Sequence, residues 1–159
     1  MANLSKIPWT AGTLLLIACA TQLATAAEPP TDLCALLPAA VVSKGLGETY
    51  GSPQKTVAPR PFANTASGAD CSYQSKSARS SLLFRAYVDP SPSAATDLFA
   101  RLKGFFGKGS TSVTGIGDEA YSDANGGLHV RKGKVRFFLS GSATDKQLRD
   151  LAIGVVGQL

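Results

Sequence analysis

The chain has 159 residues, of which 44% are hydrophobic and 17% are charged, and its formal net charge is +5. This composition is ordinary for a globular domain with one hydrophobic core, and it excludes a mostly disordered chain. The positive excess is too mild to indicate a nucleic-acid-binding protein. It leaves anionic lipid head groups, cell-wall polymers and acidic proteins open as partners.

The first 27 residues have the layout of a secretory signal. Lys6 carries the one charged side chain, an apolar run spans residues 11–18, and small residues follow through Ala27. A transmembrane helix needs about 20 apolar residues, and this run is roughly half as long. The segment therefore predicts export without a membrane-spanning helix.

Two cleavage sites compete within this segment. Residues 16–19 read Leu-Ile-Ala-Cys, the order of a bacterial lipobox, in which a peptidase cuts just before a lipidated cysteine. Cleavage there predicts a signal at residues 1–18, a flexible tether at 19–30 and a single domain at 31–159.

The alternative is an A-x-A site at residues 24–26, which removes residues 1–26 together with Cys19 and releases a soluble protein. We favour lipidation of Cys19, and both alternatives stay open at this point. The predicted location is the periplasm or outer cell envelope, with membrane anchoring if Cys19 is lipidated and a soluble protein otherwise.

The residues after the tether predict two short helices. Apolar residues at 33–37 indicate the first, and Pro38 opens the second, with Val41 and Val42 inward and an end at Gly47.

Extended structure follows these helices. Residues 50–69 form a proline-containing loop with an edge strand near 56–58, and strands are expected at 70–74 and 81–88. In the last of these the apolar residues alternate, so one face of that strand is expected in the core.

The second half predicts a helix, a meander of strands and a final helix. Ser91 is a suitable N-cap before Pro92, and the helix that follows presents one apolar stripe made of Ala95, Leu98, Phe99, Leu102 and Phe106. Strands are expected at 119–122, 128–131 and 135–140, and Thr144 with Gln147 forms a capping box for the last helix. The order of elements predicts an α+β fold: a single domain with an antiparallel sheet of about five strands covered by helices on one side.

Cys34 and Cys71 remain as an even pair in the exported chain. In an oxidising compartment such a pair predicts a disulfide, and the alternative is two unpaired buried thiols.

Three sequence motifs resemble ligand sites but are better explained as turns. Residues 115–120 match G-x-G-x-x-A without the strand and helix that a dinucleotide site needs, and 107–111 resemble the end of a phosphate loop. Asp123 and Asn125 lack the further oxygen ligands of a calcium loop. We expect no cofactor and no metal.

Catalytic machinery is incomplete in this sequence. His129 is the single histidine, so a His-His metal pair cannot form, and no G-x-S-x-G motif is present. We expect His129 to be an exposed or half-buried strand residue. Asp118, Glu119 and Asp123 leave a carboxylate pair open, but we assign no catalytic residue.

A basic hairpin is the strongest candidate for anion binding. Arg131, Lys132, Lys134 and Arg136 surround one tight turn, and such a cluster can hold phosphate, sulfate or anionic lipid. The alternative is an exposed turn whose lysines protect strand edges from aggregation.

Several short sequence words resemble a known family. Residues 32–37 (DLCALL), 45–47 (GLG), 71–73 (CSY) and 113–120 (VTGIGDEA), with the closing helix, are similar to small bacterial envelope lipoproteins of unknown function, best known from actinobacteria. The resemblance spans most of residues 31–159. It implies a lipidated or secreted α+β domain, similar to the PsbP-like fold, with the two cysteines bridged, and it transfers no catalytic residue.

These observations predict a non-enzymatic cell-envelope domain that binds another protein or a small ligand. A hydrolase acting on wall or lipid material and an anion-binding or lipid-surface module are the alternatives. An apolar pocket between the sheet and the helix at 94–106 favours the ligand-binding domain. Clustering of Asp118, Asp123 and His129 in one cleft favours the hydrolase.

Overall fold

The computed structural model describes residues 29–62, 65, 67–106 and 108–159. The predicted signal, both cleavage alternatives and the lipidation site Cys19 lie outside the described residues and stay predictions. Within the described part of the chain, no helix has the length and apolar character needed to cross a membrane.

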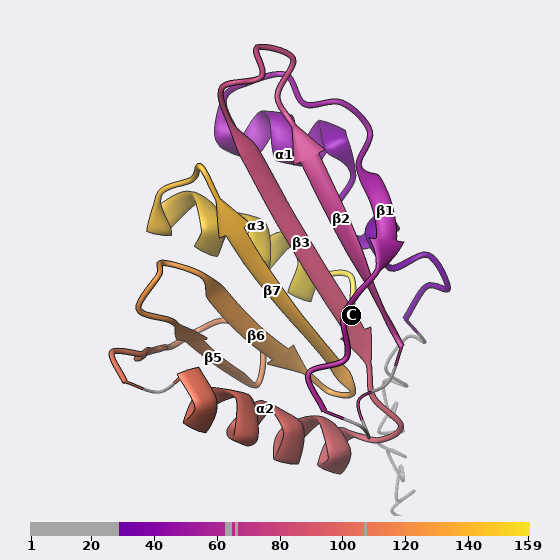
Figure 1. The fold of residues 1–159 in the computed structure, drawn as a ribbon, viewed down its shortest axis with the longest axis vertical. Helices are drawn as coiled ribbons and strands as arrows, with labels where there is room; N and C mark the ends of the chain where they lie inside the picture. Colours follow the sequence, from indigo (N-terminus) through magenta and orange to yellow (C-terminus); the bar gives the residue numbers. More distant parts are fainter. Residues whose placement is uncertain (1–28, 63–64, 66, 107) are drawn as a thin grey trace, which may run out of the picture.

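One antiparallel sheet dominates the fold (Figure 1). In the described residues its strands are β1 (Gln54–Val57), β2 (Gly68–Gln74), β3 (Ser81–Val88), β4 (Thr111–Val113), β5 (Glu119–Ser122), β6 (Leu128–Lys132) and β7 (Val135–Gly141). They pair in the order β1-β2-β3-β7-β6-β5-β4. The predicted meander is confirmed, because β5 pairs with β6 and β6 pairs with β7, both antiparallel. β2 and β3 are also antiparallel neighbours.

The expected number of about five strands is too low, because the sheet has seven strands in the described residues. The two additions extend the sheet at its two edges. β1 was expected only as a short strand near 56–58, and all four of its residues are exposed; β4 has three residues, of which one is buried. Such edge strands are held by backbone pairing on one side, so their sequences need no alternation of apolar residues.

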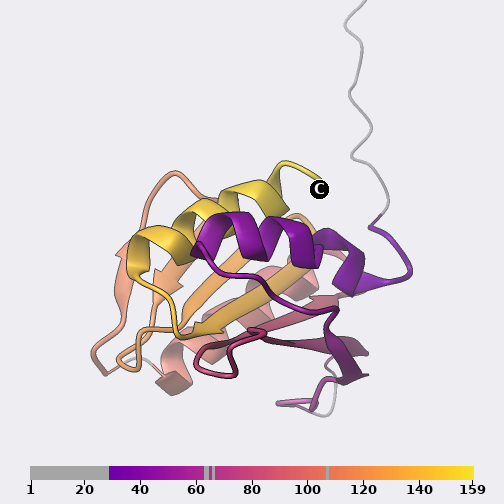
Figure 2. The ribbon, with the colours of Figure 1, turned by 90° about the horizontal axis from the view of Figure 1, so that it is seen from above.

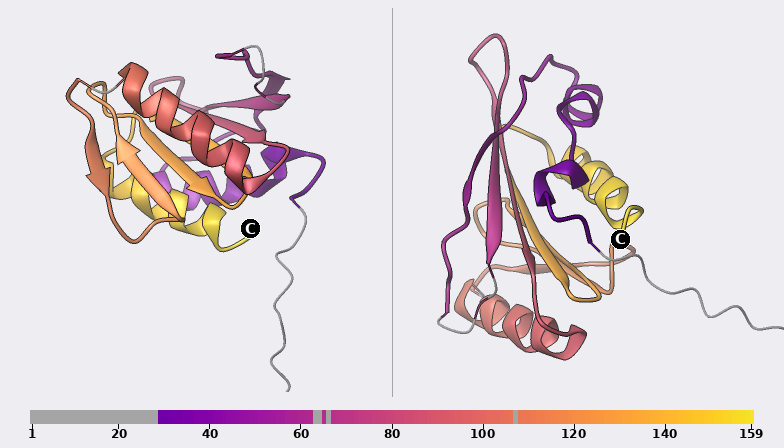
Figure 3. Two further views of the ribbon diagram at one scale, coloured as in Figure 1. Left: turned by 90° about the horizontal axis from the view of Figure 1, so that it is seen from below. Right: turned by 90° about the vertical axis from the view of Figure 1, so that its right-hand side faces the viewer.

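Helices lie on both faces of the sheet, so the prediction that they cover one side is wrong. The helical segments are η1 (Leu33–Leu36), α1 (Ala39–Leu46), α2 (Pro92–Phe106) and α3 (Asp145–Val156). Figure 2 shows α1 and α3 side by side over one face, and both views of Figure 3 show α2 across the other. The α+β class is confirmed.

The main core lies between the sheet and the layer of η1, α1 and α3. Alternate residues of the central strands point into it, among them Phe84, Phe137 and Leu139, and α3 adds a fully buried stripe. The predicted capping box of α3 is present, and Gly47 ends α1 in the left-handed conformation. Of the two valines expected inward, Val42 is buried and Val41 is exposed.

The predicted disulfide is present between Cys34 and Cys71. It joins η1 to the middle of β2, and both cysteines are buried. Asp32 caps η1 by accepting a hydrogen bond from the Cys34 backbone amide. The bridge therefore fixes the first described segment of the chain to the sheet.

Candidate functional site

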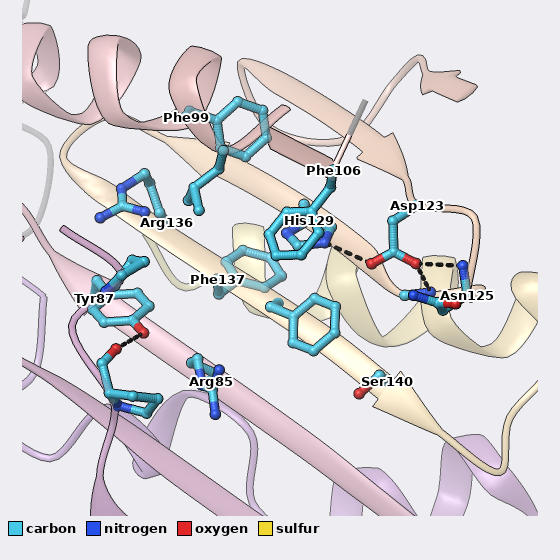
Figure 4. A pocket seen from close by; sticks show the side chains of 15 residues that line it. Arg85, Tyr87, Phe99, Phe106, Asp123, Asn125, His129, Arg136, Phe137 and Ser140 are labelled. Carbon is cyan, nitrogen blue, oxygen red and sulfur yellow. Dashed lines mark hydrogen bonds and ion pairs between the residues drawn. The ribbon is translucent and has the colours of Figure 1, made fainter. Parts of the chain in front are cut away.

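A pocket lies on the α2 face of the sheet, where the helix covers only part of the strands. Its volume is about 510 Å³, and Figure 4 shows side chains from α2, β3, β6 and β7 pointing into it. The loop at Pro59 and Pro61 forms one further wall, and the turn at 123–127 forms another.

The apolar stripe of α2 has two different surroundings. Its first half is buried, since Ala95, Leu98 and Phe99 have almost no exposed surface. The Phe99 ring packs edge-on against Tyr121, with the centroids 5.2 Å apart. Leu102 and Phe106 belong to the same stripe but are less buried, and together with Phe99 they line the pocket. The helical spacing therefore predicted the stripe correctly, but its second half meets a cavity instead of a closed core.

One line of residues crosses five strands on this face of the sheet, and three of its members, Arg85, Phe138 and His129, line the pocket. Asp70, Arg85, Phe138, His129 and Tyr121 are successive partners in the register of β2, β3, β7, β6 and β5. Since partners in register project from the same face of a sheet, residues far apart in the chain become neighbours. The His129 ring stacks on Tyr121 and also lies against Phe138, with both centroid distances 4.5 Å.

His129 is buried, with 8% of its surface exposed, so the expectation of an exposed or half-buried position is wrong. Its Nε2 lies 2.9 Å from Oδ2 of Asp123. The other carboxylate oxygen accepts hydrogen bonds from the backbone amides of Asn125 (2.8 Å) and Gly127 (3.0 Å). Asp123 and Asn125 thus form a turn, as expected, and this turn holds the histidine.

The Asp123–His129 pair has a defined charge state at neutral pH. Burial lowers the pKa of His129, and the hydrogen bond to Asp123 offsets only part of this. Burial also raises the pKa of Asp123, but the bonds from His129, Gly127 and Asn125 lower it by more, so it lies below its ordinary value. A neutral imidazole therefore donates from Nε2 to a carboxylate, which leaves Nδ1 as an acceptor.

Two arginines at the pocket are each held by a carboxylate. Arg85 makes a bidentate pair with Asp70, with N···O distances of 2.6 and 2.7 Å, and this hydrogen bond raises the pKa of the Arg85 guanidinium. Arg136 binds both oxygens of Asp89, with Nη2 3.0 Å from Oδ1, and only 3% of it is exposed. Its guanidinium also lies over the Tyr87 ring, 5.0 Å from the centroid.

The predicted basic hairpin does not present its charges as one patch. Arg131 and Lys132 share the carboxylate of Asp118, each at 3.1 Å, and Arg136 is buried in its pair with Asp89. The backbone amide of Gly133 also donates to Asp118. Burial raises the pKa of Asp118, but these donors outweigh it and leave the pKa below its ordinary value.

The carboxylates that sequence left open for catalysis are separated. Asp123 and His129 line the pocket together, whereas Asp118 lies in the turn before β5 and binds the hairpin, and Glu119 pairs with Lys103. Among the residues that the structure describes, no group of three metal-ligating side chains is present.

The glycine motif at 115–120 is a turn leading into β5, as predicted. Gly115 and Gly117 adopt φ values of 81° and 62°. A Cβ atom on Gly117 would lie 2.4 Å from the backbone oxygen of Arg131. The close approach between this turn and β6 therefore requires glycine.

Sequence reasoning missed most of the pocket. The alternation in residues 81–88 leaves Arg85 and Tyr87 on the face opposite the core, and it indicates no role for them. The sequence likewise indicates no role for Phe138 and Ser140. The available signal was polar and aromatic residues alternating on the non-core face of two strands. Such a pattern also describes a solvated face, so it becomes informative only once α2 is placed above it.

No protein-family model matches this chain, and no curated protein matches it either. Among solved structures, it is similar to the extracellular domain of PknH from Mycobacterium tuberculosis, with a TM-score of 0.50 and 12% sequence identity. The match covers 82% of this chain and 97% of that chain. At this identity the similarity shows a shared fold. The resemblance to envelope lipoproteins stays a prediction.

Proposed function

We propose that this chain is an exported, non-enzymatic cell-envelope domain that binds an uncharged, largely apolar small molecule in the pocket beneath α2. The observation that carries the proposal is the pocket itself, in which Leu102, Phe106 and Phe138 provide apolar walls. Its volume of about 510 Å³ lies within the range typical of small-molecule sites. Export is supported by the N-terminal signal pattern, the disulfide and the fold shared with an extracellular domain.

The charge arrangement favours a neutral ligand. Arg85 and Arg136 are bound bidentately by Asp70 and Asp89, and the carboxylate of Asp123 is occupied by three donors. A charged ligand would have to break one of these pairs and leave a buried partner uncompensated, which is costly. Hydrogen bonds to polar atoms of the ligand would then come from neutral groups such as the Ser140 hydroxyl and Nδ1 of His129.

The test is a titration of the full chain with the neutral apolar dye Nile red. A Leu102→Glu variant places a charge in the apolar wall and is expected to lose at least about ten-fold in affinity, because each buried CH₂ group contributes about 0.8 kcal/mol and an uncompensated charge costs more. Ile153→Glu is the matched control, since Ile153 is exposed on the opposite layer. Equal binding by both variants would contradict the proposal.

A hydrolase is the second candidate, favoured by the presence of the Asp123–His129 pair in the pocket. In that role Nδ1 of His129 accepts a proton from water or from a substrate hydroxyl. His129→Gln keeps a donor for Asp123 but removes the base. If the parent chain hydrolyses a neutral ester and the variant does not, the result supports a hydrolase. If the variant hydrolyses the ester equally well, the hydrolase is excluded.

Anion binding at the hairpin stays a prediction. Neutralising Lys132 and Lys134 is expected to reduce retention on anionic lipid or wall polymer, and the retention of the parent should fall steeply with salt. Unchanged retention would exclude this function.

Lipidation is tested by the intact mass of the native protein. A chain that starts at a diacylated Cys19 differs clearly in mass from one that starts after residue 26.

A further inference from the structure

Two adjacent aromatic rings at the C-terminal end of α2 lie outside both the core and the buried part of the stripe. Phe105 is 79% exposed and Phe106 is 41% exposed. Their rings meet edge-on, with centroids 5.2 Å apart. The helix that carries them lies at the margin of the molecule (Figure 1). The other large exposed hydrophobic residues in the described part of the chain are single aliphatic side chains on separate elements, namely Val41, Val57 and Ile153.

The fold itself does not explain Phe105. Phe106 reaches toward His129, with centroids 5.8 Å apart, and so closes one side of the pocket. Phe105 projects from the same turn with most of its ring in water. A polar residue at this position would serve α2 equally well, so this ring indicates a contact outside the chain.

The charged residues closest to the two rings along the chain are lysines. Lys103 and Lys108 lie within three residues of Phe105 on either side. Lys103 makes a long pair of 3.5 Å with the partly exposed Glu119. The acidic residue of α2 itself is Asp97, two turns before Phe105. The aromatic end is therefore flanked by lysines.

From this juxtaposition we infer that the end of α2 is a membrane-contact site for an anionic bilayer surface. Aromatic rings partition to the boundary between head groups and acyl chains, and lysines beside them bind anionic head groups. A second copy of this chain fits less well, because two such ends would bring their lysines together. The inference goes beyond the proposed function and does not depend on it.

The contact has a geometric consequence for the pocket. Phe106 belongs to both the aromatic end and the pocket wall. With Phe105 inserted at the bilayer boundary, the pocket opens beside the membrane surface instead of toward bulk solvent.

The test uses the full chain and a single fluorescent reporter. Trp9 is the one tryptophan of the sequence and lies in the segment predicted to be cleaved. Trp9→Phe combined with Phe105→Trp therefore places a single reporter at the aromatic end whether or not that segment is removed. With phosphatidylglycerol vesicles we expect a blue shift of its emission and quenching by brominated acyl chains. Trp9→Phe combined with Ile153→Trp is the control, because Ile153 is 53% exposed on the opposite layer.

Two substitutions give an independent readout by vesicle flotation. Lys108→Gln is expected to lower partitioning to anionic vesicles about five-fold, since one lysine near such a surface contributes about 1 kcal/mol. Phe105→Ser is expected to lower it further, and Ile153→Ser to leave it unchanged. A reporter at 105 that stays in water, responds no more than the one at 153, or becomes shielded with rising protein concentration without vesicles would overturn the inference.

Discussion

Reduction of the Cys34–Cys71 disulfide is expected to lower the free energy of unfolding by about 4 kcal/mol. The two cysteines are 37 positions apart, so the bridge closes a loop of about 38 residues in the unfolded chain. In the chain-entropy model, opening such a loop restores about 13 cal/mol/K of conformational entropy to the unfolded state, which is about 4 kcal/mol near 25 °C. The whole stability of a domain this size is about 5 to 15 kcal/mol.

The assay is urea unfolding of the wild-type chain with and without reductant, followed by circular dichroism. Reduction of the wild-type protein is the cleaner perturbation, because both cysteines are buried and substitution would also remove packing. The Cys34→Ala, Cys71→Ala double variant is the control, and reductant should not affect its transition. A wild-type midpoint that does not move on reduction would refute the entropic argument, as would labelling of both thiols in the untreated folded protein.

Three further predictions concern the buried groups around the pocket and the turn before β5. Arg136→Met is expected to lower the free energy of unfolding by about 3 to 5 kcal/mol, because it leaves the carboxylate of Asp89 buried without its partner. In urea unfolding, the double variant Arg136→Met, Asp89→Leu should regain much of this stability. A double variant as unstable as the single one would argue against a contribution from the pair. His129 has a pKa below its ordinary value of 6.5, so the folded state binds fewer protons than the unfolded chain as the pH falls through that value. Stability should therefore be complete above pH 6.5 and decline below it, and His129→Gln should flatten this part of the profile; an unchanged profile would mean that another group titrates. Gly117→Ala is expected to cost more than about 1 kcal/mol, since φ is +62° and the added Cβ meets a backbone oxygen of β6; a thermal melt that coincides with that of the wild type would contradict the required close approach.

Local structure and the disulfide bond could both be predicted from the order of the amino acids. Alternation of apolar residues predicted β3, and the Thr144–Gln147 capping box predicted the start of α3. An even pair of cysteines after a predicted export signal indicated the Cys34–Cys71 bond. The strand and the capping box depend on residues close together in the sequence, and the disulfide prediction depends on the number of cysteines. Short-range geometry therefore carries enough information to fix them.

The face of the sheet that α2 covers, and the pocket beneath it, could not be predicted before the elements were packed together. The helix presents an apolar stripe, but a stripe does not say which side of a sheet it meets. The neighbours of His129 come from β5, β7, α2 and a turn, so its burial followed from strand register and helix placement and not from its own segment. Likewise, the basic side chains of the hairpin form ion pairs with carboxylates that are distant in the sequence. Asp89, which binds Arg136, lies 47 positions away from it. Cross-strand pairing joins residues that are remote along the chain, and it is this pairing that makes the pocket.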